Sequence, residues 1–183
     1  MAHQAGPEAQ AGQLNGPDQE RLLALASRLQ ELALERGFRV ASAESCTGGL
    51  IGHGLTSIPG SSGYYLGGIV SYADGAKVEL LGVPATTIEH HGAVSAQVAV
   101  SMAEGARARL GCDYAMAVTG VAGPDGGTDA KPVGLTYVAA VGPDGHAVRR
   151  YQWSGDRASN KTQSAVAALE LLIDLATSGS SGP

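Results

Sequence analysis

The alternation of short apolar segments with helix-patterned segments constrains the fold more than any other feature of this sequence. Three apolar runs of strand length lie at 38–43, 68–72 and 114–118. Stretches with helical periodicity surround them, at about 22–37, 50–57, 76–81, 95–110 and 159–176. Strands that alternate with helices favour a parallel sheet with helices on both of its faces.

Local chemistry marks where several of these helices begin and end. Pro17 and Asp18 open an amphipathic segment that Gly37 closes, and its leucines recur every three or four residues, at Leu22, Leu25, Leu29 and Leu32. Ser95 is predicted to cap the helix that runs to about residue 110. Each of these helices presents one apolar face to a core.

The pattern changes after residue 128. Two strand-like runs, 133–141 and 147–153, flank Gly142-Pro143-Asp144-Gly145, which is typical of a hairpin turn. We therefore expect a three-layer α/β/α sandwich with a mostly parallel sheet and an antiparallel hairpin at its edge. The exposed edge of that hairpin could pair with the same edge of a second copy, which would give a homo-oligomer.

The length and composition fit a single domain. A chain of 183 residues can bury roughly two thirds of its unfolded surface without disulfide or metal support. Glycine contributes 27 residues and aromatic residues only 4%, so the core must be built from Ala, Val, Leu and Ile. We expect a disordered tail over 1–16, the domain over 17–177 and a frayed end over 178–183.

Charge and cysteine usage exclude several classes of function. The net charge is -5, and no basic cluster is longer than Arg149-Arg150, which argues against nucleic acid as a partner. The sequence has no secretory leader and no 18-residue apolar stretch, so we expect no membrane association and a cytoplasmic location. Cys46 and Cys112 lack metal-ligand spacing and are expected to be reduced thiols.

Three loops follow predicted strands and contain residues suited to chemistry. They span 44–49, 72–77 and 119–128, and they bring Ser45 beside Cys46, Tyr72 with Lys77, and a stretch rich in glycine. In open α/β sheets, ligands bind outside the carboxyl ends of the strands. We therefore expect the three loops to converge and supply a nucleophile, a base and a backbone cradle.

Several known signatures are absent from the sequence. It contains no Walker P-loop, no Gly-x-Gly-x-x-Gly at the start of a helix, no nucleophile elbow and no Ser-x-x-Lys. His90 and His91 would point to different sides of any regular backbone, and Asp125 and Asp129 lack further metal ligands. A serine activated by a lysine distant in sequence remains open, and we expect no metal.

Six blocks of residues, taken in order, resemble the nicotinamide-nucleotide amidohydrolase family, whose domain also occurs at the C-terminus of the competence/damage-inducible protein CinA. The blocks are Glu44-Ser45-Cys46-Thr47-Gly48-Gly49, Tyr72 with Lys77, His91-Gly92-Ala93-Val94-Ser95, Gly120-Val121-Ala122-Gly123-Pro124-Asp125-Gly126-Gly127-Thr128, Lys131-Pro132-Val133-Gly134 and Gly155-Asp156-Arg157. The likeness covers about 22–172. Since only a short tail precedes it, we expect a member that stands alone.

The resemblance implies hydrolysis of the carboxamide of nicotinamide mononucleotide to nicotinate mononucleotide and ammonia, within pyridine-nucleotide salvage and without a cofactor. The serine, lysine and tyrosine of the family match Ser45, Lys77 and Tyr72. The expected substrate-binding residues are Glu44, Cys46, Thr47, Gly48, Thr119, Gly120, Gly123 and Arg157, the last being suited to a phosphate. A neutral buried lysine could take the serine proton, and a tyrosine could relay it to the leaving ammonia.

Other interpretations of these residues remain open. Ser45 could simply cap the following helix, and Cys46 is a rival nucleophile without a paired histidine. Glu44 could orient Lys77 or merely place a charge at a helix start. At the level of function, the alternatives are a non-catalytic regulatory module that binds pyridine nucleotides, and an amidase that acts on a different amide.

Overall fold

A computed structural model describes residues 16–178 and contains a five-stranded sheet in the order β2-β1-β3-β4-β5. The strands are β1 (Val40–Glu44), β2 (Tyr65–Val70), β3 (Tyr114–Gly120), β4 (Leu135–Gly142) and β5 (Gly145–Gln152). β2, β1 and β3 are parallel, whereas β4 is antiparallel to both of its neighbours, so four of the five strands share one direction. The predicted hairpin is β4–β5 at the sheet edge, and the expected fold class is confirmed.

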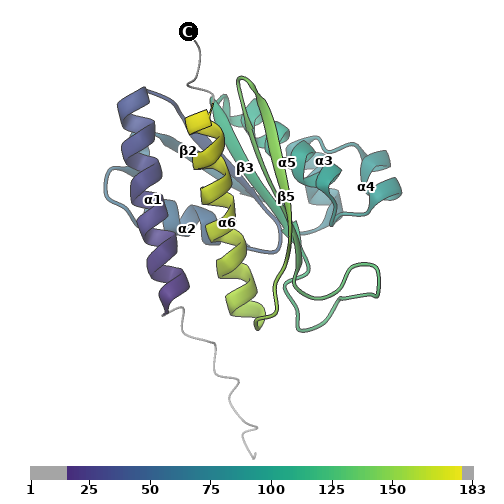
Figure 1. The fold of residues 1–183 in the computed structure, drawn as a ribbon. Coiled ribbons are helices and arrows are strands. Elements are labelled where there is room, and N and C mark those ends of the chain that lie inside the picture. The colour runs from purple at the N-terminus through teal and green to yellow at the C-terminus, as the bar shows by residue number, and fades with distance from the viewer. Residues whose placement is uncertain (1–15, 179–183) are drawn as a thin grey trace, which may run out of the picture.

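Helices cover both faces of this sheet (Figure 1). On one face lie α1 (Pro17–Arg36), α2 (Leu50–Thr56) and α6 (Arg157–Ser178), with α1 and α6 side by side. On the other lie α3 (Asp74–Leu81), α4 (Ala85–His91) and α5 (Ala96–Leu110), of which α5 packs directly on the strands. A short 3-10 turn, Ser61–Gly63, precedes β2. None of the helices within 16–178 has the length and apolar character needed to cross a bilayer.

The helix signals in the sequence correspond to physical features of the structure. Leu22 and Leu29 are buried along α1, and Gly37 closes the helix in the left-handed region at φ 70°. The Ser95 hydroxyl accepts a hydrogen bond from the Val98 amide, as a helix cap requires. These two helices are therefore positioned by an apolar stripe and by their end residues, as predicted.

The two helical layers pack against the sheet through cores of different composition. The core beneath α1, α2 and α6 contains large side chains such as Leu29, Ile51 and Leu172. The core beneath α5 is built mostly from alanine and valine on β1, β3 and β4 and on the facing side of α5. An alanine-rich face lets a helix lie close to the sheet, because few side-chain atoms stand between the two backbones.

The contact between α3 and α5 is closer still. A Cβ atom built on Gly105, in the middle of α5, would lie 2.0 Å from the Leu81 carbonyl oxygen at the end of α3. Glycine in the interior of a helix costs about 1 kcal/mol relative to alanine. The close approach of the two backbones accounts for glycine at this position.

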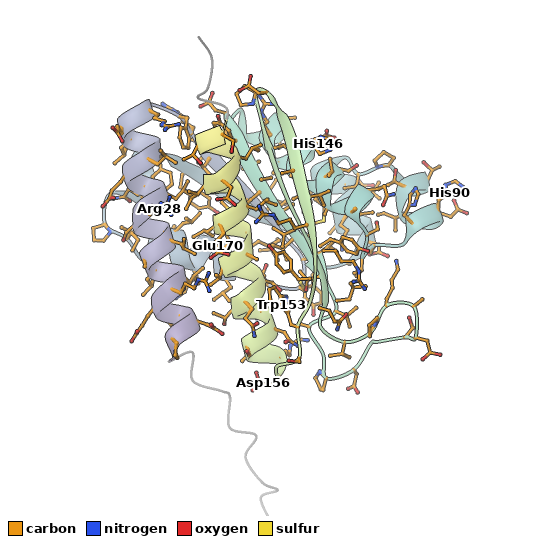
Figure 2. All side chains as sticks on the ribbon, viewed as in Figure 1. Arg28, His90, His146, Trp153, Asp156 and Glu170 are labelled. Carbon is orange, nitrogen blue, oxygen red and sulfur yellow. The ribbon has the colours of Figure 1, made fainter. Side chains whose placement is uncertain are left out.

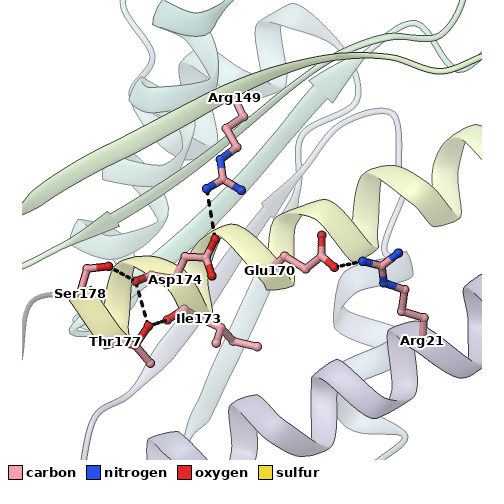
Figure 3. Close-up of polar contacts among 7 residues, drawn as sticks. All are labelled: Arg21, Arg149, Glu170, Ile173, Asp174, Thr177 and Ser178. Carbon is pink, nitrogen blue, oxygen red and sulfur yellow. Dashed lines mark hydrogen bonds and ion pairs between the residues drawn. The ribbon is translucent and has the colours of Figure 1, made fainter.

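Ion pairs hold α6 between α1 and β5 on the surface (Figure 3). Arg21 of α1 pairs with Glu170, and Arg149 of β5 pairs with Asp174 at 3.1 Å. Their side chains are partly or largely exposed, so each pair is worth at most about 1 kcal/mol. The buried apolar face of α6 supplies most of its attachment.

Some element boundaries differ from those predicted. β2 begins at Tyr65 rather than 68 and ends at Val70, because a register shift between Val40 and Ala41 accommodates an extra residue near Gly67 (φ 144°). α4 was not predicted, since Ile88 is its only large apolar residue. α6 begins at Arg157 and includes Ser178, which we had expected to belong to the frayed end. The remaining tail predictions, for 1–15 and 179–183, lie outside the described residues.

Candidate active site

A pocket of about 230 Å³ lies at the carboxyl ends of the parallel strands and is formed by the three predicted loops. It also includes the segment before α5 and the first residue of α6. The lining residues are Ser45, Cys46, Tyr72, Asp74, Lys77, Ala93, Val94, Thr119, Gly120, Val121, Ala122, Gly123, Asp125, Gly126 and Arg157. The pocket brings together residues as far apart in sequence as Ser45 and Arg157, which are separated by 112 positions. It lies where an open α/β sheet binds its ligands.

Ser45 lies one residue beyond β1 and is 7% exposed. Its amide donates to the Val118 carbonyl at 3.0 Å, so the backbone is held by the neighbouring strand. Its hydroxyl makes no hydrogen bond with any group of the described chain. The residue at the N-cap of α2 is Gly49, at φ 98°, and not Ser45. The capping interpretation of Ser45 is therefore wrong, and the hydroxyl faces the pocket uncommitted.

Lys77 extends its amine from α3 to the floor of the same pocket. The side chain is almost fully buried, and Nζ donates to the carbonyl oxygens of Ser71 and Tyr72, each at 3.1 Å. The Asp74 carboxylate is a more distant acceptor at 3.5 Å. The two carbonyls accept from two N–H groups, so the third position on nitrogen pairs with the Asp74 carboxylate when it holds a proton and can accept a proton when it holds a lone pair. Lys77 and Ser45 share the pocket but are not directly hydrogen-bonded.

Tyr72 and Arg157 meet at the mouth of the pocket. Arg157 is the first residue of α6, whose start is marked by Asp156 in Figure 2. Its guanidinium donates to the Tyr72 hydroxyl at 2.9 Å and to the Gly123 carbonyl at 2.6 Å. Asp156 does not pair with Arg157 but caps α6, since its carboxylate accepts from the Ser159 amide at 2.8 Å. Arg157 thus joins two of the loops across the opening.

The loop after β3 lines one wall. The Thr119 hydroxyl donates to the Ala93 carbonyl at 2.8 Å, which ties the segment before α5 to the strand end. Gly120 has no room for a side chain, because a Cβ would lie 2.7 Å from the Leu135 carbonyl oxygen. The Lys131 amine donates to the His91 carbonyl at 2.7 Å and holds the far part of the loop. Thr119, Gly120 and Gly123 line the pocket, and their part in substrate binding stays a prediction.

Three predicted substrate-binding residues, Glu44, Thr47 and Gly48, are not among the residues that line the pocket. The buried Glu44 carboxylate accepts hydrogen bonds from the Thr47 hydroxyl at 2.8 Å and from the amides of Gly49, Ile51 and Gly52 at 2.9–3.1 Å. Glu44 therefore satisfies the donors at the start of α2 rather than orienting Lys77. The Thr47 hydroxyl is committed to that carboxylate, and Gly48 is exposed on the outer side of the loop.

Cys46 lines the pocket but is a poor candidate for the nucleophile. The side chain is buried, and this burial raises the pKa of the Cys46 thiol to about 12. Only the thiolate is strongly nucleophilic, and it is scarcely populated near neutral pH when the pKa is so high. The comparison of the two adjacent residues favours Ser45.

Backbone donors stand next to the Ser45 hydroxyl. The Thr47 amide has no acceptor among residues 16–178, whereas the Cys46 amide hydrogen-bonds the thiol of its own residue. Unpaired amides beside a nucleophile are the groups that stabilise the negative oxygen of a tetrahedral intermediate. The pocket therefore contains an uncommitted hydroxyl, a buried amine and a phenol, with an unpaired amide two residues after the hydroxyl, a set suited to acyl transfer.

One residue of the pocket lining, Asp74, was not predicted from the sequence. Asp74 lines the pocket beside Lys77, but a lone aspartate at a helix start gives no distinguishing signal.

The histidines that the structure describes do not gather at the pocket. His90 lies at the outer end of α4 and His146 near the hairpin turn, both away from the start of α6 (Figure 2). Across the described part of the chain, no group of three His, Cys, Asp or Glu side chains could hold a metal ion.

Fold and pocket together define an α/β protein with a serine-bearing pocket at the carboxyl ends of its parallel strands. Residues 22–182 match the family model of the CinA C-terminal domain, and the chain belongs to that family. It is 55% identical to a CinA-like protein of Geotalea uraniireducens over 123 residues, which is 67% of this chain and 29% of that protein. The chain spans about a third of the length of the curated relatives it matches.

The fold of this chain is also similar to that of solved structures of CinA-family proteins, over nearly the whole length of each. The competence/damage inducible protein CihA from Agrobacterium tumefaciens is 41% identical, with a TM-score of 0.83 over 85% of this chain and 95% of that one. A CinA superfamily protein from Klebsiella pneumoniae is 31% identical, with a TM-score of 0.82 over 86% and 98%. The family resemblance seen in the six sequence blocks is confirmed.

Proposed function

We propose that this protein hydrolyses the carboxamide of nicotinamide mononucleotide to nicotinate mononucleotide and ammonia, with Ser45 as the nucleophile. The observation that carries the proposal is the uncommitted Ser45 hydroxyl in a pocket that also contains Lys77 and Tyr72. An amide is a poor electrophile, so its hydrolysis requires an activated nucleophile and donors for the developing oxyanion. Both requirements have candidates among the residues of this pocket.

In the proposed mechanism, the Ser45 oxygen attacks the carboxamide carbon while its proton passes to the neutral amine of Lys77. The carbonyl oxygen becomes negative and is stabilised by the Thr47 amide, which has no other acceptor among residues 16–178. The C–N bond then breaks, and the departing nitrogen takes the proton that Lys77 had received, relayed by Tyr72, so that ammonia leaves, Lys77 is neutral again and an ester forms on Ser45. Water then attacks this ester to release the carboxylate and restore the serine.

Arg157 is the proposed partner of the substrate phosphate. Its guanidinium has five N–H donors, and two of them are used by Tyr72 and Gly123. The remaining donors lie at the pocket mouth, where a charge-assisted contact with phosphate would orient the mononucleotide and leave its nicotinamide ring nearer Ser45. The same contacts couple substrate binding to the position of the Tyr72 hydroxyl.

We place this reaction in the cytoplasm and in pyridine-nucleotide salvage. Cys46 and Cys112 are buried and unpaired, which is typical of proteins kept in a reducing compartment. No step of the proposed mechanism requires an electron acceptor or a metal, because Ser45, Lys77 and Tyr72 supply the nucleophile and move the protons.

Ammonia release from a panel of amides tests the proposal. We expect turnover of nicotinamide mononucleotide, weaker turnover of nicotinamide riboside, and little of free nicotinamide. Preference for an unrelated amide would replace the substrate but keep the reaction. Tight binding of the mononucleotide, measured by calorimetry, without release of ammonia would instead identify a regulatory binding module.

A further inference from the structure

A second serine hydroxyl beneath the pocket has no hydrogen-bond partner. Ser71 is fully buried, and its Oγ contacts no donor or acceptor in the part of the chain that the structure describes. Buried hydroxyls are nearly always hydrogen-bonded, since removing one from water without a new partner is unfavourable. The unpaired Ser71 hydroxyl therefore points to a partner that it meets in another state of the site.

Strand register places Ser71 beside the proposed nucleophile. The last pair of the β1–β2 ladder is Glu44 with Val70, and the Ser71 amide extends it by donating to the Glu44 carbonyl at 2.8 Å. The next pair is therefore Ser45 with Ser71. Neighbouring strands lie about 4.8 Å apart, so two serine hydroxyls at paired positions can meet by rotation about χ1.

Both side chains point to the same face of the sheet as Lys77. Ala43 and Ile69, two residues earlier on each strand, pack in the core beneath α5. Side chains alternate along a strand, so Ser45 and Ser71 point to this face as well. The Lys77 amine reaches the same place from α3, where it donates to the Ser71 carbonyl at 3.1 Å.

We propose that the Ser71 hydroxyl links the Lys77 amine to the Ser45 hydroxyl. The proposal rests on the serine mechanism proposed above and explains how Lys77 acts without a direct bond to Ser45. Ser71 does not line the pocket, so it acts through Ser45 and is a positioning residue rather than one that touches substrate.

The proposed transfer through Ser71 conserves the number of protons and the total charge. As the Ser45 oxygen bonds to the amide carbon, its proton moves to the Ser71 oxygen, and the proton that Ser71 carried moves to the lone pair of the neutral Lys77 amine. Lys77 becomes an ammonium group and the carbonyl oxygen becomes negative. Ser71 ends with one proton, as it began, and the backbone carbonyls of Ser71 and Tyr72 hold the new cation.

Three variants test this role in the full chain. Ser71→Ala should lower kcat for the mononucleotide about 10- to 100-fold and leave KM within about twofold, whereas Ser71→Thr should restore most of the rate. Ser42→Ala is the matched control, because Ser42 is equally buried on β1 but bonds the Tyr65 hydroxyl at 2.7 Å on the other face. The control should keep kcat within about twofold of the parent, and thermal melting should show that each variant is folded.

A double-variant cycle separates a shared pathway from independent effects. If Ser71 and Lys77 act as one unit, Ser71→Ala combined with Lys77→Met should be no slower than Lys77→Met alone. Effects that multiply would overturn the link. A kcat of Ser71→Ala within twofold of the parent would overturn it too, while leaving the amidase activity in place.

The reactivity of Ser45 toward a fluorophosphonate, followed by intact mass, gives a readout that needs no amide substrate. Ser71→Ala should label at least about tenfold more slowly than the parent, and Ser42→Ala at the parental rate. Slower labelling in a protein that hydrolyses no nicotinamide nucleotide would uphold the link and reject the substrate. Unchanged labelling of Ser71→Ala, or no labelling of Ser45 in the parent, would reject the link.

Discussion

Glu44 and Ser45 are adjacent at the end of β1, yet their polar groups differ in every respect that matters for function. Glu44 points toward α2, where its carboxylate accepts four hydrogen bonds. Ser45 points to the other face, where its hydroxyl accepts and donates none within the described chain. A buried polar group with all its bonds formed stabilises structure, whereas one with bonds unformed is available to a ligand. Four substitutions test this contrast.

Ser45→Ala should have the largest effect, lowering kcat at least about 1,000-fold because it removes the nucleophile. Since the hydroxyl has no partner in the protein, the free energy of unfolding should change by less than about 1 kcal/mol. Ammonia release and urea denaturation measure the two quantities. Cys46→Ala is the control and should retain substantial turnover. Full activity in Ser45→Ala, or a loss confined to Cys46→Ala, would assign the chemistry to another residue.

Lys77→Met should lower kcat by about 10²- to 10⁴-fold, because the amine that accepts the serine proton is removed while the buried chain keeps its length. Steady-state kinetics with nicotinamide mononucleotide measures kcat, and thermal melting checks that the variant is folded. A folded Lys77→Met protein with a kcat within about twofold of the parent would contradict the assignment.

Glu44→Ala should have the opposite outcome to Ser45→Ala: a large loss of stability rather than of chemistry. Three amides and the Thr47 hydroxyl would lose their acceptor, so we expect the free energy of unfolding to fall by about 3 kcal/mol or more. Glu104→Ala, at an exposed position of α5, should change it by less than about 0.5 kcal/mol. If Glu44→Ala were as stable as the parent, the contrast between the two residues would fail.

Arg157→Ala should have the smallest of the four effects. Loss of a charge-assisted contact with phosphate should cost roughly 1.5–3 kcal/mol, or about ten- to two-hundred-fold in kcat/KM with the mononucleotide. With the riboside, which lacks the phosphate, any loss should be much smaller and should reflect only the contact of Arg157 with Tyr72. Equal losses with both substrates would show that Arg157 positions Tyr72 and does not bind phosphate.

Local signals in the sequence predicted much of the fold. The Ser95 cap, the Gly37 helix end and the Gly142–Gly145 turn all depend on residues within a few positions of one another, and all three appear in the structure. α4 escaped prediction because a short helix with one large apolar residue has no recognisable periodicity. The start of β2 was misplaced, because a register shift depends on the partner strand and not on β2 alone.

The pocket itself was predictable to the extent that topology dictates it. Loops at the carboxyl ends of parallel strands must lie near one another, so Ser45, Tyr72 and Thr119 could be grouped from strand order alone. The direction in which Glu44 bonds, and the contact of Arg157 with Tyr72 across 85 positions, depend on packing that no local pattern encodes. For the same reason a single serine such as Ser71 carried no signal.

The missing side chain at Gly105 has a consequence for how this protein can change over generations. Alanine is favoured over glycine by about 1 kcal/mol in the interior of a helix, so helix propensity alone would favour it at this position. The added methyl group would push against the Leu81 carbonyl and displace the helix that carries Lys77. The usual stabilising change from glycine to alanine is therefore unavailable at Gly105, because it would move the helix that carries Lys77, 28 positions earlier in the chain.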